Sequence, residues 1–127
     1  MSSRRLHFAL DLKSDPALIA EYEAWHRPER IWPRIPEFLR AAGVLDLEIF
    51  RCGDRLVMVM EVPEGFSAAR HDELAKADHQ AKAWEELMWW FQRPLPFAAS
   101  GEKWVPMTRV FSLKETLEGL EGKESRA

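Results

Sequence analysis

The sequence has only one cysteine, Cys52, so no disulfide bond can form within the chain and nothing indicates an oxidising compartment. It also has no apolar run of signal-peptide length near the N-terminus. No stretch approaches the roughly 20 consecutive apolar residues that a membrane-spanning helix needs. From these absences we expect a cytoplasmic protein that does not associate with membranes.

A surplus of basic residues is missing as well, because 18 Lys and Arg residues are outnumbered by 21 Asp and Glu residues. The net charge of −3 gives no electrostatic footprint for nucleic acid, so no nucleic-acid partner is predicted. At 127 residues, 46% of them hydrophobic, the chain has the size and balance of one globular domain. We place that domain at residues 1–113 and expect the polar stretch 114–127 to be a loose tail or a frayed helix.

Motifs for nucleotides and metals are also absent: there is no G-x-G-x-x-G, no P-loop and no nucleophile elbow, and the four histidines lack metal-ligand spacing. We therefore predict neither a cofactor nor a metal. His71 and His79 lie in polar stretches and are expected to be solvated. Asp11 and Glu61 would form a carboxylate pair if they met across neighbouring strands, a register that the sequence leaves open.

What the sequence does contain is alternation of hydrophobic and polar residues with the period of a β-strand, in residues 5–12 and 44–51. Strands are predicted at residues 5–12, 44–51, 55–62 and 104–113, and helices at residues 16–26, 36–42, 67–77 and 79–92. This order is typical of the α+β, ferredoxin-like βαββαβ fold, a four-stranded antiparallel sheet with helices on one face. Residues 56–60 are apolar on both strand faces, which favours a second sheet as cover and therefore a homodimeric α/β barrel.

The segment 21–36, EYEAWHRPERIWPRIP, is rich in aromatic residues and is interrupted by prolines. Tyr22 and His26 are four residues apart, so they lie on one face of a helix, one turn apart. Arg27 precedes a proline and is pushed out of the helical region, which puts His26 at or near the helix end.

Two interpretations of this pair stay open. In one, His26 is a general acid/base, because the imidazole pKa lies nearest working pH, and Tyr22 orients a hydroxylated substrate. In the other, His26 only stabilises the C-terminal end of its helix, and Tyr22 is a packing neighbour.

The predicted helix 79–92 is dominated by apolar residues at helical spacing. These residues are expected to be core: Ala81, Trp84, Leu87, Met88 and Phe91. Trp89 and Trp90 cannot both face that core, so one of them is predicted to be free for a ligand, a loop or a partner subunit.

Residues 21–51, EYEAWHRPERIWPRIPEFLRAAGVLDLEIFR, resemble the L-rhamnose mutarotases, whose hallmark is Glu-Tyr, three residues, His, a proline and then Ile-Trp-Pro. Trp84, Met88 and Pro94, the string GEKW at 101–104 and the string RVFSL at 109–113 strengthen the resemblance. It extends over about residues 5–113, which is the whole predicted domain without the tail.

The resemblance implies a homodimeric α/β barrel that interconverts the α and β anomers of L-rhamnose or a similar 6-deoxyhexose without a cofactor. It implies that His26 is the catalytic proton donor and that Tyr22 and Trp84 bind the substrate.

The chain also departs from the family pattern. Ala83 stands where the family has the first of two adjacent tryptophans that contact the substrate, and Leu47 stands where it has a substrate-binding tyrosine. Two residues are also added between His26 and Ile31. We expect Trp89, or its neighbour, to rebuild the missing part of the wall.

The predicted function is therefore a sugar mutarotase of the aldose 1-epimerase type, an isomerase whose small-molecule partner is a monosaccharide. Two alternatives remain. One is a non-catalytic dimeric barrel that binds a sugar or another small ligand. The other is a haem-handling or oxygenase enzyme of the same barrel type, with His26 as the iron ligand.

Overall fold

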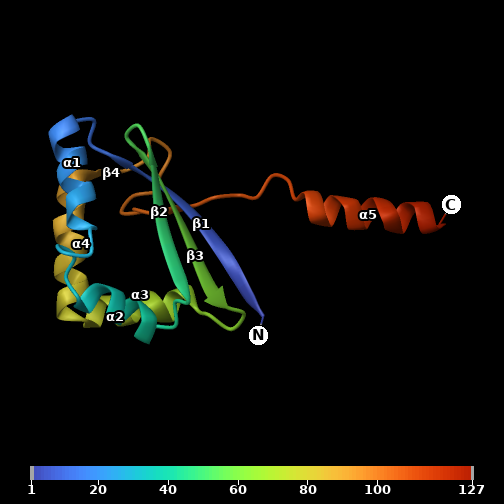
Figure 1. Ribbon diagram of the computed structural model, residues 1–127, viewed down its shortest axis with the longest axis horizontal. Helices are drawn as coiled ribbons and strands as arrows, with labels where there is room; N and C mark the ends of the chain where they lie inside the picture. The colour runs from blue at the N-terminus through green and yellow to red at the C-terminus, as the bar shows by residue number, and fades with distance from the viewer. Residues whose placement is uncertain (1, 127) are drawn as a thin grey trace.

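The computed structural model describes residues 2–126 and consists of an antiparallel sheet with helices packed on one side (Figure 1). The strands are β1 (Ser3–Leu12), β2 (Asp46–Cys52), β3 (Arg55–Pro63), β4 (Gln92–Arg93) and β5 (Val105–Pro106). The helices are α1 (Pro16–Trp25), α2 (Arg34–Ala41), α3 (Ala68–Ala77), α4 (His79–Phe91) and α5 (Leu113–Arg126). The predicted α+β, ferredoxin-like arrangement is confirmed.

The sheet is arranged around β1 and β3, which pair along almost their whole lengths, from Ser3↔Pro63 to Asp11↔Arg55. β2 joins β3 through a tight hairpin turn in which Gly53 has a φ of 62°. Glycine adopts this left-handed conformation without the steric cost that a Cβ brings. On the other edge of β1, the short strands β4 and β5 each contribute two pairs.

Successive residues of each strand point to opposite sides of the sheet, and the main helices cover only one side (Figure 1). On that side β3 places Leu56, Met58 and Met60, all at most 9% exposed. On the other side it places Val57 and Val59, which are only half-buried. We call these two sides the covered face and the open face.

Short capping contacts begin the helices that build the covered face. The Asp15 carboxylate accepts a hydrogen bond from the Ala17 amide at 2.9 Å and begins α1, as predicted. The Asp78 carboxylate accepts one from the Ala81 amide at 3.0 Å and begins α4. Asp78 also accepts a bond from Arg34 Nε at 3.0 Å, which ties the start of α4 to α2.

The strand predicted at residues 104–113 is mostly not a strand. Only Val105 and Pro106 pair with β1, and the Met107 amide donates to the His7 carbonyl at 2.8 Å. Pro106 has no amide proton, so it fits only an edge position, as its presence predicted. Residues 107–112 then leave the sheet, and α5 projects from the body of the molecule (Figure 1).

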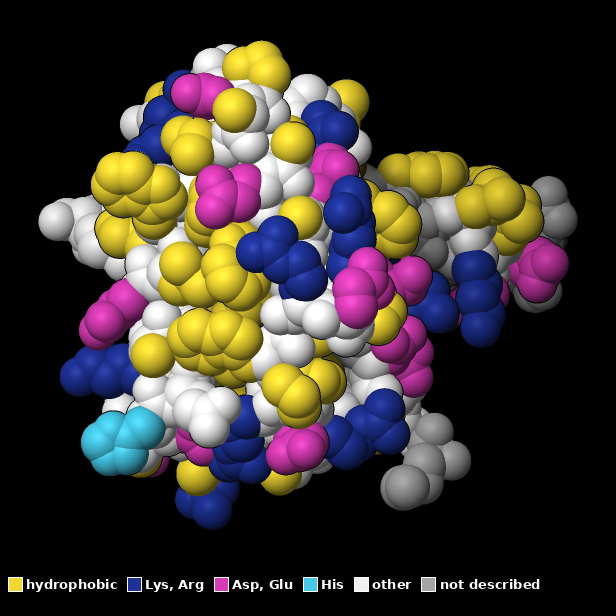
Figure 2. Space-filling model, turned by 60° about the vertical axis from the view of Figure 1, so that its left-hand side comes forward, with side chains coloured by type: hydrophobic (Ala, Val, Ile, Leu, Met, Phe, Trp, Pro, Cys, Tyr) yellow, Lys and Arg dark blue, Asp and Glu magenta, His cyan; other side chains and the backbone are white. Residues whose placement is uncertain are grey.

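The projecting segment, residues 107–126, exposes large apolar side chains (Figure 2). Those at least 47% exposed are Met107, Val110, Phe111, Leu113, Leu117 and Leu120. The predicted loose tail or frayed helix is a helix, capped by a bond from the Glu115 amide to the Ser112 hydroxyl at 3.2 Å. Residue 127 lies outside the described residues.

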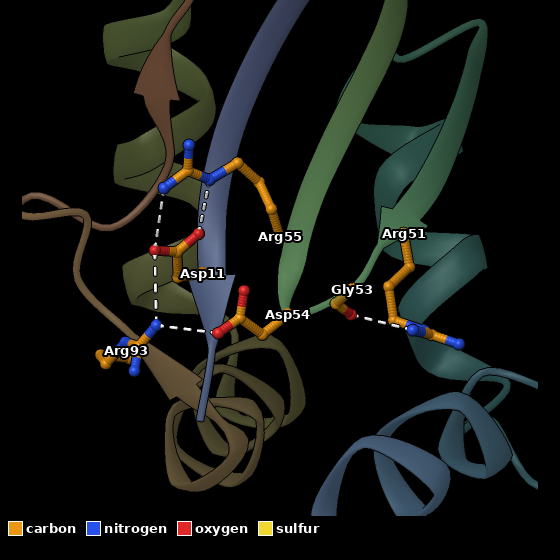
Figure 3. A network of polar contacts seen from close by, with 6 residues as sticks. All are labelled: Asp11, Arg51, Gly53, Asp54, Arg55 and Arg93. Atoms are coloured by element: carbon orange, nitrogen blue, oxygen red, sulfur yellow. Dashed lines mark hydrogen bonds and ion pairs between the residues drawn. The ribbon is translucent and has the colours of Figure 1, made fainter. Parts of the chain in front are cut away.

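Asp11 is a buried carboxylate, 2% exposed, near the end of β1 (Figure 3). Arg55 Nε donates to its Oδ1 at 2.8 Å, and Arg93 approaches Oδ2 at 3.7 Å. These guanidinium groups, Arg55 above all, lower the pKa of Asp11, against the effect of burial. The register places Glu61 opposite Arg5, so the hypothesis of a carboxylate pair between Asp11 and Glu61 is wrong.

Candidate active site

A cavity of about 700 Å³ lies between the covered face of the sheet and the helices. This size falls within the about 300–1,000 Å³ typical of small-molecule sites. The residues that β1, β2 and β3 place in its wall are all apolar: Leu6, Phe8, Leu47, Ile49, Met58 and Met60. Polar groups enter from the helices and from the segments that follow α4: Tyr22, His26, His71, Asp72, Lys76, Glu85, Gln92, Glu102 and Lys103. A few polar groups in an apolar wall can fix the orientation of a small hydroxylated ligand.

The predicted pair of Tyr22 and His26 lines this cavity from the last turn of α1. Their ring centroids are 4.5 Å apart, as the spacing of four residues along a helix requires. His26 is the C-terminal cap of α1, where the chain turns towards Pro28. Trp84 comes from α4 and meets the His26 ring edge-on, at 5.5 Å between centroids. The structure therefore brings three of the four predicted site residues together.

The hydrogen bonding of His26 determines which ring nitrogen can act on a ligand. Nδ1 lies 2.7 Å from the backbone carbonyl of Tyr22. A carbonyl only accepts, so the neutral ring carries its proton on Nδ1, and Nε2 is left with a free lone pair. Burial lowers the pKa of His26 from its ordinary value, and the bond to the carbonyl opposes this effect only in part. The ring is thus a neutral base near neutral pH.

Tyr22 is 3% exposed and shares a hydrogen bond with Gln92, whose Nε2 donates to the phenol oxygen at 3.4 Å. Burial raises the pKa of Tyr22 to about 12, so the phenol stays protonated at any working pH. Sequence reasoning did not single out Gln92, because its position after an apolar helical run indicates only a helix end. The pairing of Gln92 with Leu12 turns its side chain towards the covered face, which no local pattern could have shown.

Tryptophans form a large part of the wall beside His26. Trp84 is 6% exposed and packs edge-on against Trp32 at 5.3 Å and Trp25 at 6.4 Å between ring centroids. Trp104, from the segment before β5, also lines the cavity. Leu47 lines it from β2. Trp25 and Trp32 therefore support Trp84 from behind, while Trp84 and Trp104 line the cavity.

Trp89, the fourth predicted site residue, is not among the residues that line the cavity. It is 40% exposed on the outer side of α4, and Lys103 Nζ lies 5.0 Å from its ring centroid. Trp90 is 62% exposed, with Lys13 Nζ at 4.4 Å from its ring centroid. Ala83 is exposed as well.

His71 was expected to be solvated, and that prediction is wrong. It lies on α3, lines the cavity and packs between Phe38 and Phe66, at 5.8 and 5.6 Å between ring centroids. The sequence around it is polar because the other sides of α3 face solvent. His79, by contrast, is exposed as predicted.

Among the side chains of residues 2–122, no three His, Cys, Asp or Glu gather in a way that could hold a metal ion. Within the described part of the chain, no helix is long and apolar enough to cross a membrane.

Comparison with known proteins gives consistent matches. The sequence profile of L-rhamnose mutarotase matches residues 5–113. An L-fucose mutarotase of Xanthomonas campestris pv. campestris is 48% identical over 122 residues, which is 96% of this chain and 98% of that protein. A UPF0734 protein of Dictyostelium discoideum is 33% identical over 112 residues, covering 83% of this chain and 86% of that protein.

Solved structures share the fold. An L-rhamnose mutarotase of Formosa agariphila superposes with a TM-score of 0.62 at 19% identity, covering 87% of this chain and 98% of that one. A dimeric ferredoxin-like protein from an uncultured marine organism gives a TM-score of 0.50 at 15% identity, covering 88% and 93%. At these identities the likeness concerns the fold alone.

Proposed function

This chain belongs to the L-rhamnose mutarotase family, and we propose that it interconverts the α and β anomers of L-fucose or L-rhamnose with His26 as the acid/base catalyst. Members of the family are isomerases that act on sugar anomers, so the reaction class follows from membership. The 48% identity to an L-fucose mutarotase favours L-fucose as the first sugar to test.

The observation that carries the assignment of His26 is its fixed, neutral ring in the cavity wall. The bond from Nδ1 to the Tyr22 carbonyl holds the ring in one orientation and keeps Nε2 unprotonated. A general base must be positioned and must have a pKa near or below working pH, and His26 meets both conditions. A histidine that served only to stabilise the helix end would be positively charged to favour the dipole, whereas burial disfavours that charge here.

The chemistry requires only the movement of one proton. Nε2 removes the proton from the anomeric hydroxyl while the bond between C1 and the ring oxygen breaks, and the imidazolium returns that proton to the ring oxygen. The open-chain aldehyde turns about its C1–C2 bond, and the reverse steps close the ring on the other face of the carbonyl. No atom is gained or lost. A positioned acid/base contributes about 10²–10⁴-fold, which suits a reaction that water already performs slowly.

The remaining wall suits a 6-deoxyhexose. The apolar strand residues, together with Trp84 and Trp104, offer surface for the methyl group and the C–H side of a pyranose ring. Tyr22 and Gln92 offer hydrogen bonds for its hydroxyls.

The working unit is a homodimer in which the open faces of two sheets meet. Val57, Val59 and Phe50 supply apolar surface on that face, and Phe50 is 54% exposed. The projecting segment, residues 107–126, adds exposed apolar side chains that a second copy would cover.

The test is anomer exchange measured by saturation-transfer NMR on L-fucose and L-rhamnose. The protein should accelerate exchange, and His26→Ala should lower the catalysed rate by at least about 100-fold while the melting temperature changes little. The matched control is His79→Ala, an exposed histidine at the start of α4, which should keep full activity.

Full exchange in His26→Ala would refute the catalytic assignment. Sugar binding without any exchange in the unmodified protein would instead support a non-catalytic barrel, and a Soret absorption band would support the haem alternative.

A further inference from the structure

Gln92 is a buried amide in the cavity wall, at the junction of α4 and β4. It is 4% exposed. Its Nε2 donates to the Tyr22 hydroxyl at 3.4 Å. Its Oε1 is buried and has no hydrogen-bond partner among the residues that the structure describes.

An unpaired buried carbonyl is costly, and proteins rarely keep one without a reason. A leucine or methionine at the same position would pack among Leu12, Tyr22 and Phe91 without that cost. The Tyr22 hydroxyl accepts from Gln92, so its own proton is available for another acceptor. Side by side, the two residues thus offer one free donor and one free acceptor.

We propose that Gln92 is a positioning residue for the sugar: it fixes the direction of the Tyr22 hydroxyl and accepts, through Oε1, a hydrogen bond from a sugar hydroxyl. A sugar hydroxyl both donates and accepts, so one hydroxyl, or two adjacent ones, satisfies the donor of Tyr22 and the acceptor of Gln92 together. The proposal rests on the proposed function, because it requires a sugar in this cavity. It adds Gln92, at the α4–β4 junction, to the substrate contacts.

The experiment compares Gln92→Leu with the unmodified protein in two measurements. The affinity for L-fucose and L-rhamnose, from NMR titration, should fall about 3- to 10-fold, which is the loss of one hydrogen bond. The melting temperature should stay the same or rise, because the unpaired amide is gone. Gln80→Leu, the same change at an exposed position of α4, should alter neither quantity. Gln92→Met, which keeps the unbranched shape, provides the same comparison if leucine does not fit.

A double-mutant cycle with Tyr22→Phe distinguishes positioning from packing. If Gln92 acts through the Tyr22 hydroxyl, removing that hydroxyl first should make the later loss of Gln92 cost less affinity than it costs alone. A packing role instead predicts independent effects, with affinity and melting temperature falling together.

Two results would overturn the proposal. In the first, the unmodified protein catalyses exchange, but the variants Gln92→Leu and Gln92→Met bind both sugars with unchanged affinity. This result would refute the role of Gln92 and leave the proposed function intact. In the second, the unmodified protein neither binds nor interconverts either sugar, which refutes both the proposed function and the proposed role of Gln92.

Discussion

The two faces of the sheet differ in chemistry although the same strands supply both. On the covered face, β3 contributes Leu56, Met58 and Met60 to a buried, uncharged surface, part of which lines the cavity. On the open face, the same strand contributes Val57 and Val59, whose neighbours on β1 and β2 include charged residues.

Because successive side chains of a strand point to opposite faces of the sheet, one strand contributes to two different surfaces. On the covered face, β1, β2 and β3 place only apolar residues in the cavity wall. The open face carries apolar residues in the middle and ion pairs such as Arg5 with Glu61 towards the end, as an interface with a polar rim does. The four predictions that follow test this contrast.

The largest expected effect is on the covered face. Leu56→Ala should lower the free energy of unfolding by about 2–5 kcal/mol, because Leu56 is 1% exposed and its loss leaves a cavity. Val57→Ala, at the neighbouring position on the open face, should cost about 1 kcal/mol or less. Urea unfolding of both variants checks this, and equal losses would contradict the contrast between the faces.

The next effect concerns assembly. Val57→Glu places a charge on the open face between Ala9 and Phe50, its partners on β1 and β2, neither of which can pair with it. An unpaired charge in an interface should weaken the dimer by about 100-fold or more. Sedimentation over a range of concentrations measures this. A dimer of unchanged affinity, or a stable monomer of 14.8 kDa for the unmodified protein, would show that the open face is not the interface.

A smaller effect is expected at Asp11, on the open face but buried by its arginines. Asp11→Asn should lower stability by about 1.5–3 kcal/mol, because it removes charge-assisted hydrogen bonds from Arg55. The pKa of Asp11 is lowered in the fold, so its contribution is complete above the unfolded pKa of about 3.9 and is lost as pH falls through the lower, folded pKa.

The unmodified protein should therefore lose stability in this acidic range more steeply than Asp11→Asn does. Thermal melts from pH 7 down to pH 2 test this expectation. Parallel curves for the two proteins would contradict it.

The smallest effect is on the pH dependence of exchange. Burial lowers the pKa of His26 below 6.5, and the neutral form is the active base. Activity should therefore persist below pH 6.5 and decline only as pH falls through the lowered pKa. Because the pKa of Tyr22 is about 12, this phenol should cause no loss on the alkaline side in the ordinary range. A rate profile centred above pH 6.5 would show that a different group titrates.

Local sequence determined much of this protein. The alternation in residues 5–12 and the apolar run at residues 56–60 predicted the central strands, and Asp15 with Pro16 predicted the start of α1. The spacing of Tyr22 and His26 predicted that they share a helix face, and Pro28 predicted the helix end. These features depend on backbone sterics, hydrogen bonds and side-chain period within a few residues, so one segment carries all the information.

Only the tertiary structure decided the rest. Gln92 and His71 face the cavity because strand pairing and helix packing turn them there, whereas Trp89 is turned away. The prediction of a strand over residues 104–113 fails beyond Pro106, because no described strand pairs with the residues that follow. The direction in which a side chain points depends on partners that are distant in the sequence. In the same way, residues 107–113 can form a strand only beside another strand with which they pair.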